Sequence, residues 1–212
     1  MRLFLASYRF GAQRDRLLEL VGDRRTAAVI ANAADAWPPS ARASAVTSDL
    51  VPLRKLGFTA EEVDLRDYIG RPDALRAALE NFGLVWVRGG NTFVLRAQFA
   101  RSGADVVLPE LLARDAFTYS GYSAGACVMT PSLHGLETLD DPGEVIPTCG
   151  IEPIWDGLGL VDRAIVPHWN SAMESNDDID NVVERYRSAR VAHWALTDDE
   201  VVVVDGDAVE LL

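Results

Sequence analysis

Short apolar segments alternate with longer amphipathic ones along most of this 212-residue chain. The apolar segments at residues 3–6, 27–31, 84–87 and 117–120 have the length of strands, and stretches of helical period separate them. This alternation is typical of strands joined by crossover helices, which build a parallel sheet covered on both faces. We therefore predict an α/β fold, a three-layer sandwich around a mostly parallel central sheet.

The remaining segments extend this pattern to the C-terminus. Asn91 can cap a helix that runs through Ser102, and Asp205-Gly206 predicts a tight hairpin into a last strand at 208–212. Residues 131–159 are rich in Pro, Gly and Asp, which predicts an irregular excursion or a hairpin over the sheet. Helical periodicity marks 14–21, 40–56, 72–82 and 178–188, and strand-like patterns mark 62–65, 164–166, 191–195 and 201–204. Neither a repeat nor a linker interrupts the sequence, so we expect a single domain over residues 1–212.

Charge and residue usage exclude several classes of function. The chain has 20 Lys+Arg against 32 Asp+Glu, a net charge of -12, which argues against nucleic acid or an anionic membrane as a partner. Lys55 is the only lysine and lies outside any glycine-rich loop, which disfavours Schiff-base and phosphate-loop chemistry. Cys127 and Cys149 are too few for a disulfide framework or a zinc site, which favours a cytoplasmic location. No apolar run approaches the roughly 20 residues of a membrane helix.

Gly121-Tyr122-Ser123-Ala124-Gly125 fits the G-x-S-x-G pattern of a nucleophile elbow, and it lies between a predicted strand and a predicted helix. The sharp turn strains the serine and leaves no room for side chains two positions to either side, which explains the glycines. Ser123 Oγ would project above the carboxyl ends of the strands, and the Ala124 N–H would face a developing oxyanion. The alternative is a packing turn in which Ser123 only caps a helix.

Gly89-Gly90 ends the neighbouring strand just before the capped helix. Two glycines let backbone N–H groups approach a ligand oxygen closely, so Gly89 or Gly90 is the natural second oxyanion donor. The competing interpretation is a simple strand-to-helix turn.

A serine nucleophile needs a general base, and the chain has three histidines. His168 follows the strand at 164–166 through Pro167, which places it on the same rim as the elbow. His134 lies in the irregular excursion, and His193 lies within a predicted strand, where a side chain more often packs than reacts. We therefore favour His168.

Two regions can supply the carboxylate that orients this base. Asp198 follows the strand at 191–195 and lies on the expected rim, whereas Asp140 and Asp141 follow the elbow in the excursion. Geometry defines a catalytic triad and chain order does not, so both regions stay open at this point.

Three segments taken together, Arg88-Gly89-Gly90-Asn91-Thr92-Phe93, Gly121-Tyr122-Ser123-Ala124-Gly125-Ala126 and Val166-Pro167-His168, resemble the peptidase E family of serine peptidases, the aspartyl dipeptidases. The similarity extends over essentially the whole chain. It implies a fold like that of the class I glutamine amidotransferases, with serine in place of their cysteine. It also implies hydrolysis of small peptides, dipeptides with an N-terminal aspartate, without a metal or an organic cofactor.

Carried over by position, the resemblance implies Ser123 as the nucleophile, His168 as the base, and Gly90 and Ala124 as oxyanion donors. The family's third residue is a glutamate in the region that resembles Leu196-Thr197-Asp198. Asp198 is one methylene shorter, and Asp141 therefore stays a rival.

Selection of an N-terminal aspartate calls for a cation near its β-carboxylate, and arginine has the best geometry for that contact. Arg88 and Arg163 lie near the predicted site loops, although each could equally pair with a surface carboxylate. Three other functions compete: a ligand-sensing family member that lost its acid, an esterase of the α/β-hydrolase type, and a cyanophycinase-like hydrolase. Apolar strands near both termini also allow a homodimer.

Overall fold

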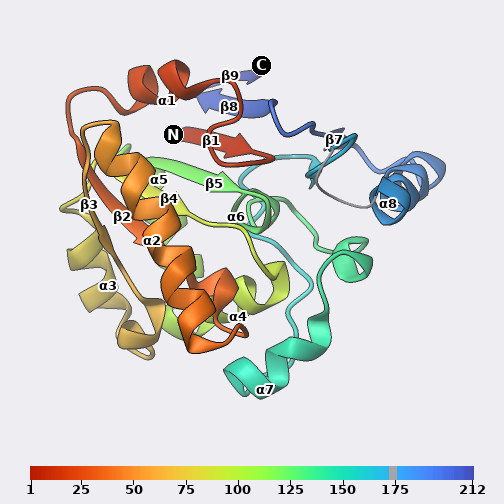
Figure 1. The fold of residues 1–212 in the computed structure, drawn as a ribbon, viewed down its shortest axis with the longest axis horizontal. Coiled ribbons are helices and arrows are strands. Elements are labelled where there is room, and N and C mark those ends of the chain that lie inside the picture. The colour runs from red at the N-terminus through yellow and green to blue at the C-terminus, as the bar shows by residue number, and fades with distance from the viewer. Residues whose placement is uncertain (172–175) are drawn as a thin grey trace.

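The computed structural model describes residues 1–171 and 176–212 and confirms a three-layer α/β architecture (Figure 1). Seven strands form the central sheet in the order β3-β2-β4-β5-β1-β8-β9. The first five in this order are parallel, whereas β8 runs antiparallel to β1 and β9 antiparallel to β8. The strands are β1 (Arg2–Ala6), β2 (Thr26–Ile30), β3 (Thr59–Glu62), β4 (Leu84–Val87), β5 (Thr118–Tyr122), β8 (Val201–Asp205) and β9 (Ala208–Leu211). The last two form the predicted C-terminal hairpin.

Helices cover both faces of this sheet, because alternate side chains of each strand point to opposite sides. In β4, Leu84 and Trp86 pack with residues of α1 (Arg14–Val21) and α2 (Pro39–Lys55), and α2 crosses in front of the sheet in Figure 1. Val85 and Val87 face the other layer, where the helices are α3 (Pro72–Leu79), α4 (Thr92–Ser102) and α5 (Ala104–Ala113). The core therefore lies in two apolar layers, one on each side of the sheet.

The excursion after the elbow contains short helical turns and no strand of its own. It comprises η3 (Leu136–Thr138), η4 (Pro142–Glu144) and α7 (Val145–Cys149), and an isolated bridge between Ser132 and Asp156 closes it. The chain then enters β6 (Ala164–Val166), which pairs in parallel with β7 (His193–Ala195) as a separate two-stranded sheet. Helix α8 (Asn176–Ser188) packs on this small sheet through residues such as Ile179 and Val182.

One local expectation was wrong, and one helix was not predicted. A strand was predicted at 62–65, but β3 ends at Glu62. The Asp64 side chain accepts a hydrogen bond from the Arg66 N–H and starts the 3-10 turn η2 (Leu65–Tyr68) instead. Helix α5 has no counterpart in the sequence prediction. Only the left-handed Gly103 separates it from α4, so no loop marks where it begins. It also contains Pro109, a residue that usually argues against a helix. Within the described ranges, no helix combines the length and the apolar character that crossing a membrane requires.

Candidate active site

Ser123 occupies a strained turn between β5 and the short helix α6 (Ala124–Cys127). Its φ of 50° and ψ of -117° fall outside the regions that non-glycine residues normally adopt. A side chain at Gly121 would collide with the Gly125 carbonyl oxygen, and one at Gly125 would collide with the Val87 carbonyl oxygen. The turn therefore has the backbone geometry of a nucleophile elbow, and its flanking glycines have the steric reason expected from the sequence.

His168 follows β6 through Pro167 and also has a positive φ, 62°. Its Nδ1 lies 2.7 Å from Asp198 Oδ1, and its side chain is 18% exposed. Because Nδ1 is taken up by Asp198, Nε2 is the ring nitrogen left to act on a neighbouring group. The structure thus brings Asp198 to His168, on the loop between β7 and β8.

Ser7 joins this pair, and sequence reasoning missed it. It follows β1 directly and is fully buried. Its Oγ accepts a hydrogen bond from the His168 backbone N–H at 2.7 Å and donates to Asp198 Oδ1 at 3.1 Å. The available signal was its position, since a polar residue at the carboxyl end of a central parallel strand lies on the rim where ligands bind.

The carboxylate of Asp198 is held in its ionised form. Partial burial opposes ionisation, but hydrogen bonds from Ser171 Oγ at 2.5 Å, from His168 and from Ser7 outweigh it and lower the pKa of Asp198 below its ordinary value. An ionised Asp198 favours the His168 tautomer with the proton on Nδ1, which leaves Nε2 free to accept one.

The Gly89-Gly90 turn lies directly beside the serine. A side chain at Gly89 would come within 2.9 Å of Ser123 Cβ and 3.3 Å of its Oγ. Gly90 has a φ of 147° and packs against the Ala33 carbonyl, so that it too excludes a side chain. The N–H groups of Gly90 and Ala124 donate no backbone hydrogen bond within the described part of the chain. They therefore remain available to an oxyanion.

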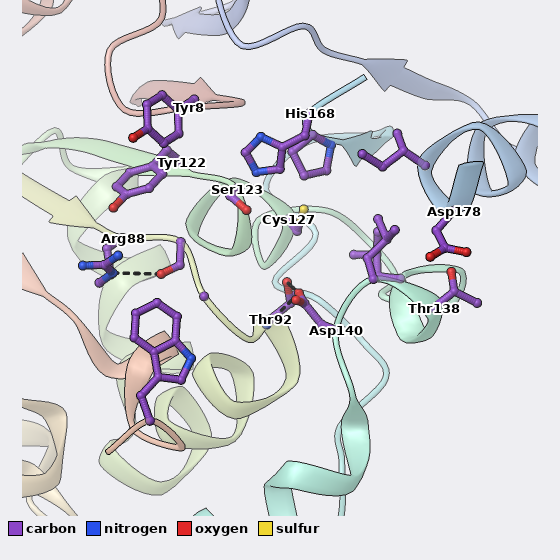
Figure 2. Close-up of a pocket in the computed structure, with 17 residues that line it drawn as sticks. Tyr8, Arg88, Thr92, Tyr122, Ser123, Cys127, Thr138, Asp140, His168 and Asp178 are labelled. Carbon is purple, nitrogen blue, oxygen red and sulfur yellow. Dashed lines mark hydrogen bonds between the residues drawn. The ribbon is translucent and has the colours of Figure 1, made fainter. Parts of the chain in front are cut away.

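Ser123 and His168 line a common pocket of about 410 Å³ with Gly89 and Gly90 (Figure 2). Asp140, one of the rival carboxylates, lines it as well. Its Oδ2 accepts hydrogen bonds from Thr92 N at 3.0 Å and Thr92 Oγ1 at 2.5 Å. Its Oδ1 accepts no hydrogen bond from the described residues, and burial raises the pKa of Asp140 despite the contacts with Thr92. Asp140 therefore offers a carboxylate to the pocket.

The other predicted carboxylate, Asp141, lies away from the histidine. Its side chain accepts a hydrogen bond from Gly143 N at 2.7 Å and starts η4. Asp141 therefore caps a turn, and the structure assigns the contact with His168 to Asp198 instead.

Of the two predicted arginines, Arg88 lines the pocket and Arg163 does not. Arg163 comes just before β6, and its guanidinium carbon lies 5.2 Å from the ring centre of Trp194 on the neighbouring strand β7, with the side chain about half exposed. The remaining histidines also lie elsewhere, with His134 stacked on Trp155 and His193 bonded to the Val191 carbonyl.

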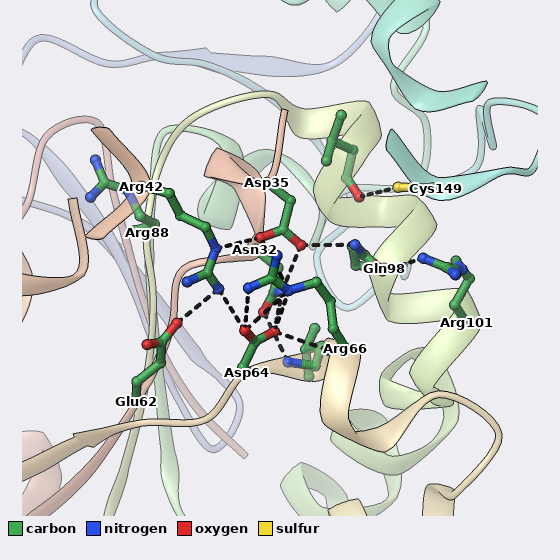
Figure 3. Close-up of polar contacts among 12 residues, drawn as sticks. Asn32, Asp35, Arg42, Glu62, Asp64, Arg66, Arg88, Gln98, Arg101 and Cys149 are labelled. Atoms are coloured by element: carbon green, nitrogen blue, oxygen red, sulfur yellow. Dashed lines mark hydrogen bonds and ion pairs between the residues drawn. The ribbon is translucent and has the colours of Figure 1, made fainter. Parts of the chain in front are cut away.

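A network of polar side chains around Asp35 and Asp64, drawn in Figure 3, supports the Gly89-Gly90 turn. Asp35, which is almost fully buried, accepts hydrogen bonds from Arg42 Nε at 2.7 Å, Asn32 Nδ2 at 2.8 Å and Gln98 Nε2 at 2.8 Å. These bonds hold the turn η1 (Asn32–Ala34), whose Ala33 carbonyl accepts the Asn91 N–H at 2.8 Å. The network thereby fixes the backbone that leads into Gly90.

The fold and the site agree with the family that the sequence matches. The model of peptidase family S51 matches residues 10–212. The chain belongs to peptidase family S51. Among relatives of this S51 chain, the uncharacterized peptidase Lin0382 of Listeria innocua is 28% identical over 160 residues, covering 76% of this chain and 73% of that protein. Peptidase E of Escherichia coli K12 (strain DH10B) is 32% identical over 121 residues, covering 57% of this chain and 49% of peptidase E. The match thus spans only about half the length of peptidase E.

Two solved structures share the fold of this chain. A putative peptidase E protein from Listeria monocytogenes EGD-e superposes with a TM-score of 0.81 at 24% identity, covering 100% of this chain and 97% of the other. A peptidase from an acI-B1 Actinobacterium superposes with a TM-score of 0.65 at 13% identity, covering 100% and 86%. Family membership makes the chain a peptidase of the S51 type with a peptidase E-like fold.

Proposed function

We propose that this S51 member is a serine-type dipeptidase that forms an acyl-enzyme on Ser123. The observation that carries the proposal is the meeting of a strained serine and an Asp198-paired histidine in one pocket beside unpaired N–H groups. A ligand-sensing protein has no need of this arrangement, whereas an esterase would use the same one. The family match supports a peptidase in particular.

In the proposed reaction, Ser123 Oγ attacks the scissile carbonyl carbon while His168 Nε2 takes the hydroxyl proton. The carbonyl oxygen becomes an oxyanion, and the N–H groups of Gly90 and Ala124 stabilise it. The C–N bond then breaks as His168 returns the proton to the leaving amine. A water molecule repeats these steps on the acyl-enzyme, which releases the first amino acid and restores Ser123.

Asp140 supports an exopeptidase with a free N-terminus in its site. The carboxylate is oriented by Thr92, its Oδ1 is unpaired among the described residues, and it lines the pocket that contains Ser123. A substrate ammonium group would satisfy this oxygen and stabilise the ionised carboxylate. An internal peptide bond offers no such cation, so the proposal restricts cleavage to the bond after the first residue.

The finer part of the proposal is a preference for an N-terminal aspartate, which the resemblance to peptidase E implies. A panel of dipeptides with Asp, Glu, Asn or Ala before Leu tests activity and selectivity together. A clear excess in kcat/KM for Asp-Leu is expected. Equal rates for all four would contradict the preference while leaving the dipeptidase assignment intact. We place this reaction in the cytoplasm, in keeping with two cysteines that are both free and buried.

The Ser123→Ala variant tests the nucleophile. We expect this variant to lose dipeptide hydrolysis and labelling by a fluorophosphonate probe while its melting temperature stays near that of the wild type. Ser44→Ala, which removes an exposed hydroxyl on α2, is the matched control and should change neither readout. Hydrolysis that survives in Ser123→Ala would refute the mechanism. A wild-type Ser123 that labels no faster than a surface serine would instead favour a ligand-sensing protein, and preferential cleavage of p-nitrophenyl esters would favour an esterase.

A further inference from the structure

The pocket carries opposite charge on its two sides. Figure 2 shows Arg88 on one side of Ser123, and Thr92, Asp140 and Asp178 on the other. We call the side with Thr92, Thr138, Asp140 and Asp178 the acidic wall, and the side with Arg88, Trp37, Tyr8 and Tyr122 the basic wall. A ligand that carries a cation at one end and an anion at the other matches this polarity.

Arg88 is held in place as a fixed cation. Its Nε donates to the Gly89 carbonyl at 2.9 Å, its Nη1 pairs with Asp49 Oδ2 at 3.2 Å, and its guanidinium carbon lies 5.4 Å from the Trp37 ring centre. The side chain is only 11% exposed, yet it lines the pocket. Its Nη2 donates to no acceptor within the described residues. Arg88 therefore presents oriented N–H groups to a carboxylate in a poorly hydrated place, where such contacts are strong.

The ion pair with Asp49 leaves the basic wall positive. Asp49 is fully buried and also accepts a hydrogen bond from the Tyr122 hydroxyl at 3.0 Å. A second guanidinium lies close by, since Arg9 packs over the Tyr8 ring at 5.5 Å and donates to the carbonyl of Ser48, the neighbour of Asp49 in the chain. Two guanidinium groups thus lie near one carboxylate, although Arg88 alone pairs with Asp49 and lines the pocket. The surroundings of the basic wall therefore carry a net positive charge.

We propose that Arg88 binds the C-terminal carboxylate of the substrate and so limits cleavage to dipeptides. This inference rests on the proposed function, in which the substrate ammonium meets Asp140 and the scissile carbon meets Ser123. The first residue then lies toward the acidic wall, and the second residue extends past Ser123 toward the basic wall. Two residues span about 7 Å when extended, so the carboxylate follows shortly after the scissile bond.

The same geometry separates the two carboxylates of an aspartyl dipeptide. The β-carboxylate of a first-residue aspartate branches from the Cα that carries the ammonium group, on the N-terminal side of the scissile carbon, whereas Arg88 lies on the far side of Ser123 from Asp140. Arg88 therefore contacts the C-terminal carboxylate and does not serve as the β-carboxylate receptor expected from the sequence. The aromatic rings of Trp37 and Tyr8, which are 38% and 36% exposed, are left to contact the side chain of the second residue.

The test compares a substrate with and without its C-terminal charge. The wild-type enzyme is assayed with three substrates. These are the dipeptide of the panel above that it cleaves best, the C-terminal amide of that dipeptide, and the tripeptide with Gly added after Leu. We expect kcat/KM to fall on the order of 10- to 100-fold for the amide and at least as far for the tripeptide, because a charged hydrogen-bonded contact is lost. Arg88→Lys and Arg88→Met should both shrink the ratio between acid and amide, with a larger effect for Met because lysine keeps the charge but not the planar fork.

Two results would overturn the inference. The first is equal kcat/KM of the wild type for the dipeptide acid and its amide. This comparison does not depend on whether any variant folds. The second is an Arg88 variant in which the kcat/KM ratio of acid to amide is unchanged but Asp-Leu and Asn-Leu are cleaved equally well. Arg88 would then bind the β-carboxylate of the first residue. Calorimetric binding of the acid and the amide to Ser123→Ala gives the same comparison without turnover. A failure of the proposed chemistry, seen as an unreactive Ser123, is thus distinguished from a failure of this inference.

Discussion

Replacement of Asp198 by asparagine isolates the role of its charge at nearly constant shape. Asp198 accepts hydrogen bonds from His168 Nδ1, Ser7 Oγ and Ser171 Oγ. An asparagine has one acceptor oxygen and an NH2 group, so it cannot accept all three. If its NH2 group faces Nδ1, the histidine must carry its proton on Nε2, where it can no longer take one from Ser123.

The expected loss follows from this tautomer change. A serine hydrolase with the wrong histidine tautomer loses roughly 10³- to 10⁴-fold in turnover, which corresponds to about 4 to 5.5 kcal/mol of transition-state stabilisation. We expect Asp198→Asn to lower kcat by this factor with little change in KM, because none of the three hydrogen bonds is to a pocket wall that binds the substrate ends. The assay is dipeptide hydrolysis followed by release of free leucine at pH 7.5 and 25 °C.

Asp141→Asn is the matched control. Its side chain accepts one hydrogen bond, from Gly143 N, and an asparagine oxygen can accept the same bond. Turnover of this control should stay within about threefold of the wild type. A loss under tenfold in Asp198→Asn, or equal losses in both variants, would refute the assignment of Asp198 as the residue that orients His168.

Three further predictions concern the surroundings of the site. Gly90→Ala should lower kcat about 10²- to 10³-fold in a folded protein. The new Cβ would collide with the Ala33 carbonyl and displace the N–H that faces the oxyanion. An unchanged kcat would exclude Gly90 as a donor. Asp35→Ala should reduce the free energy of unfolding by about 3 to 5 kcal/mol in urea titrations, since Arg42, Asn32 and Gln98 lose a buried acceptor, and a loss below 1 kcal/mol would contradict the supporting role of the network. The pKa of Asp64 is lowered from 3.8 to about 2, because hydrogen bonds from Arg66 and Asn32 and the charge of Arg42 outweigh its desolvation. A depressed pKa contributes stability above the unfolded value, so about 2 kcal/mol should be lost as pH falls from about 4 to 2; urea titrations of Asp64→Asn over that range should show a flatter dependence, and an equal slope would count against it.

Much of the fold follows from patterns within single segments. Apolar strands such as β4 and amphipathic helices such as α1 have the length and period that the sequence predicts, because burial of one face or both faces is encoded locally. The strand predicted at 62–65 was wrong, and helix α5 was missed, for local reasons as well. A side-chain hydrogen bond of Asp64 starts a 3-10 turn in place of the predicted strand, and a single left-handed glycine, Gly103, joins α4 to α5 without a loop.

The elbow at Ser123, the glycine turn at 89–90 and the rim position of His168 are predictable from the sequence, because each depends on backbone conformation within a few residues. The identity of the carboxylate that contacts His168 follows only from the folded chain. That contact joins residues 30 positions apart. It exists because β6 pairs with β7, which sets Val166 against Ala195, and because β8 pairs with β1, which brings the loop with Asp198 beside Ser7. The polarity of the pocket has the same origin, since Arg88, Asp49 and Asp140 come from three distant segments. Charged residues this far apart in the chain can act on one substrate only when the packing of the chain brings them around one serine.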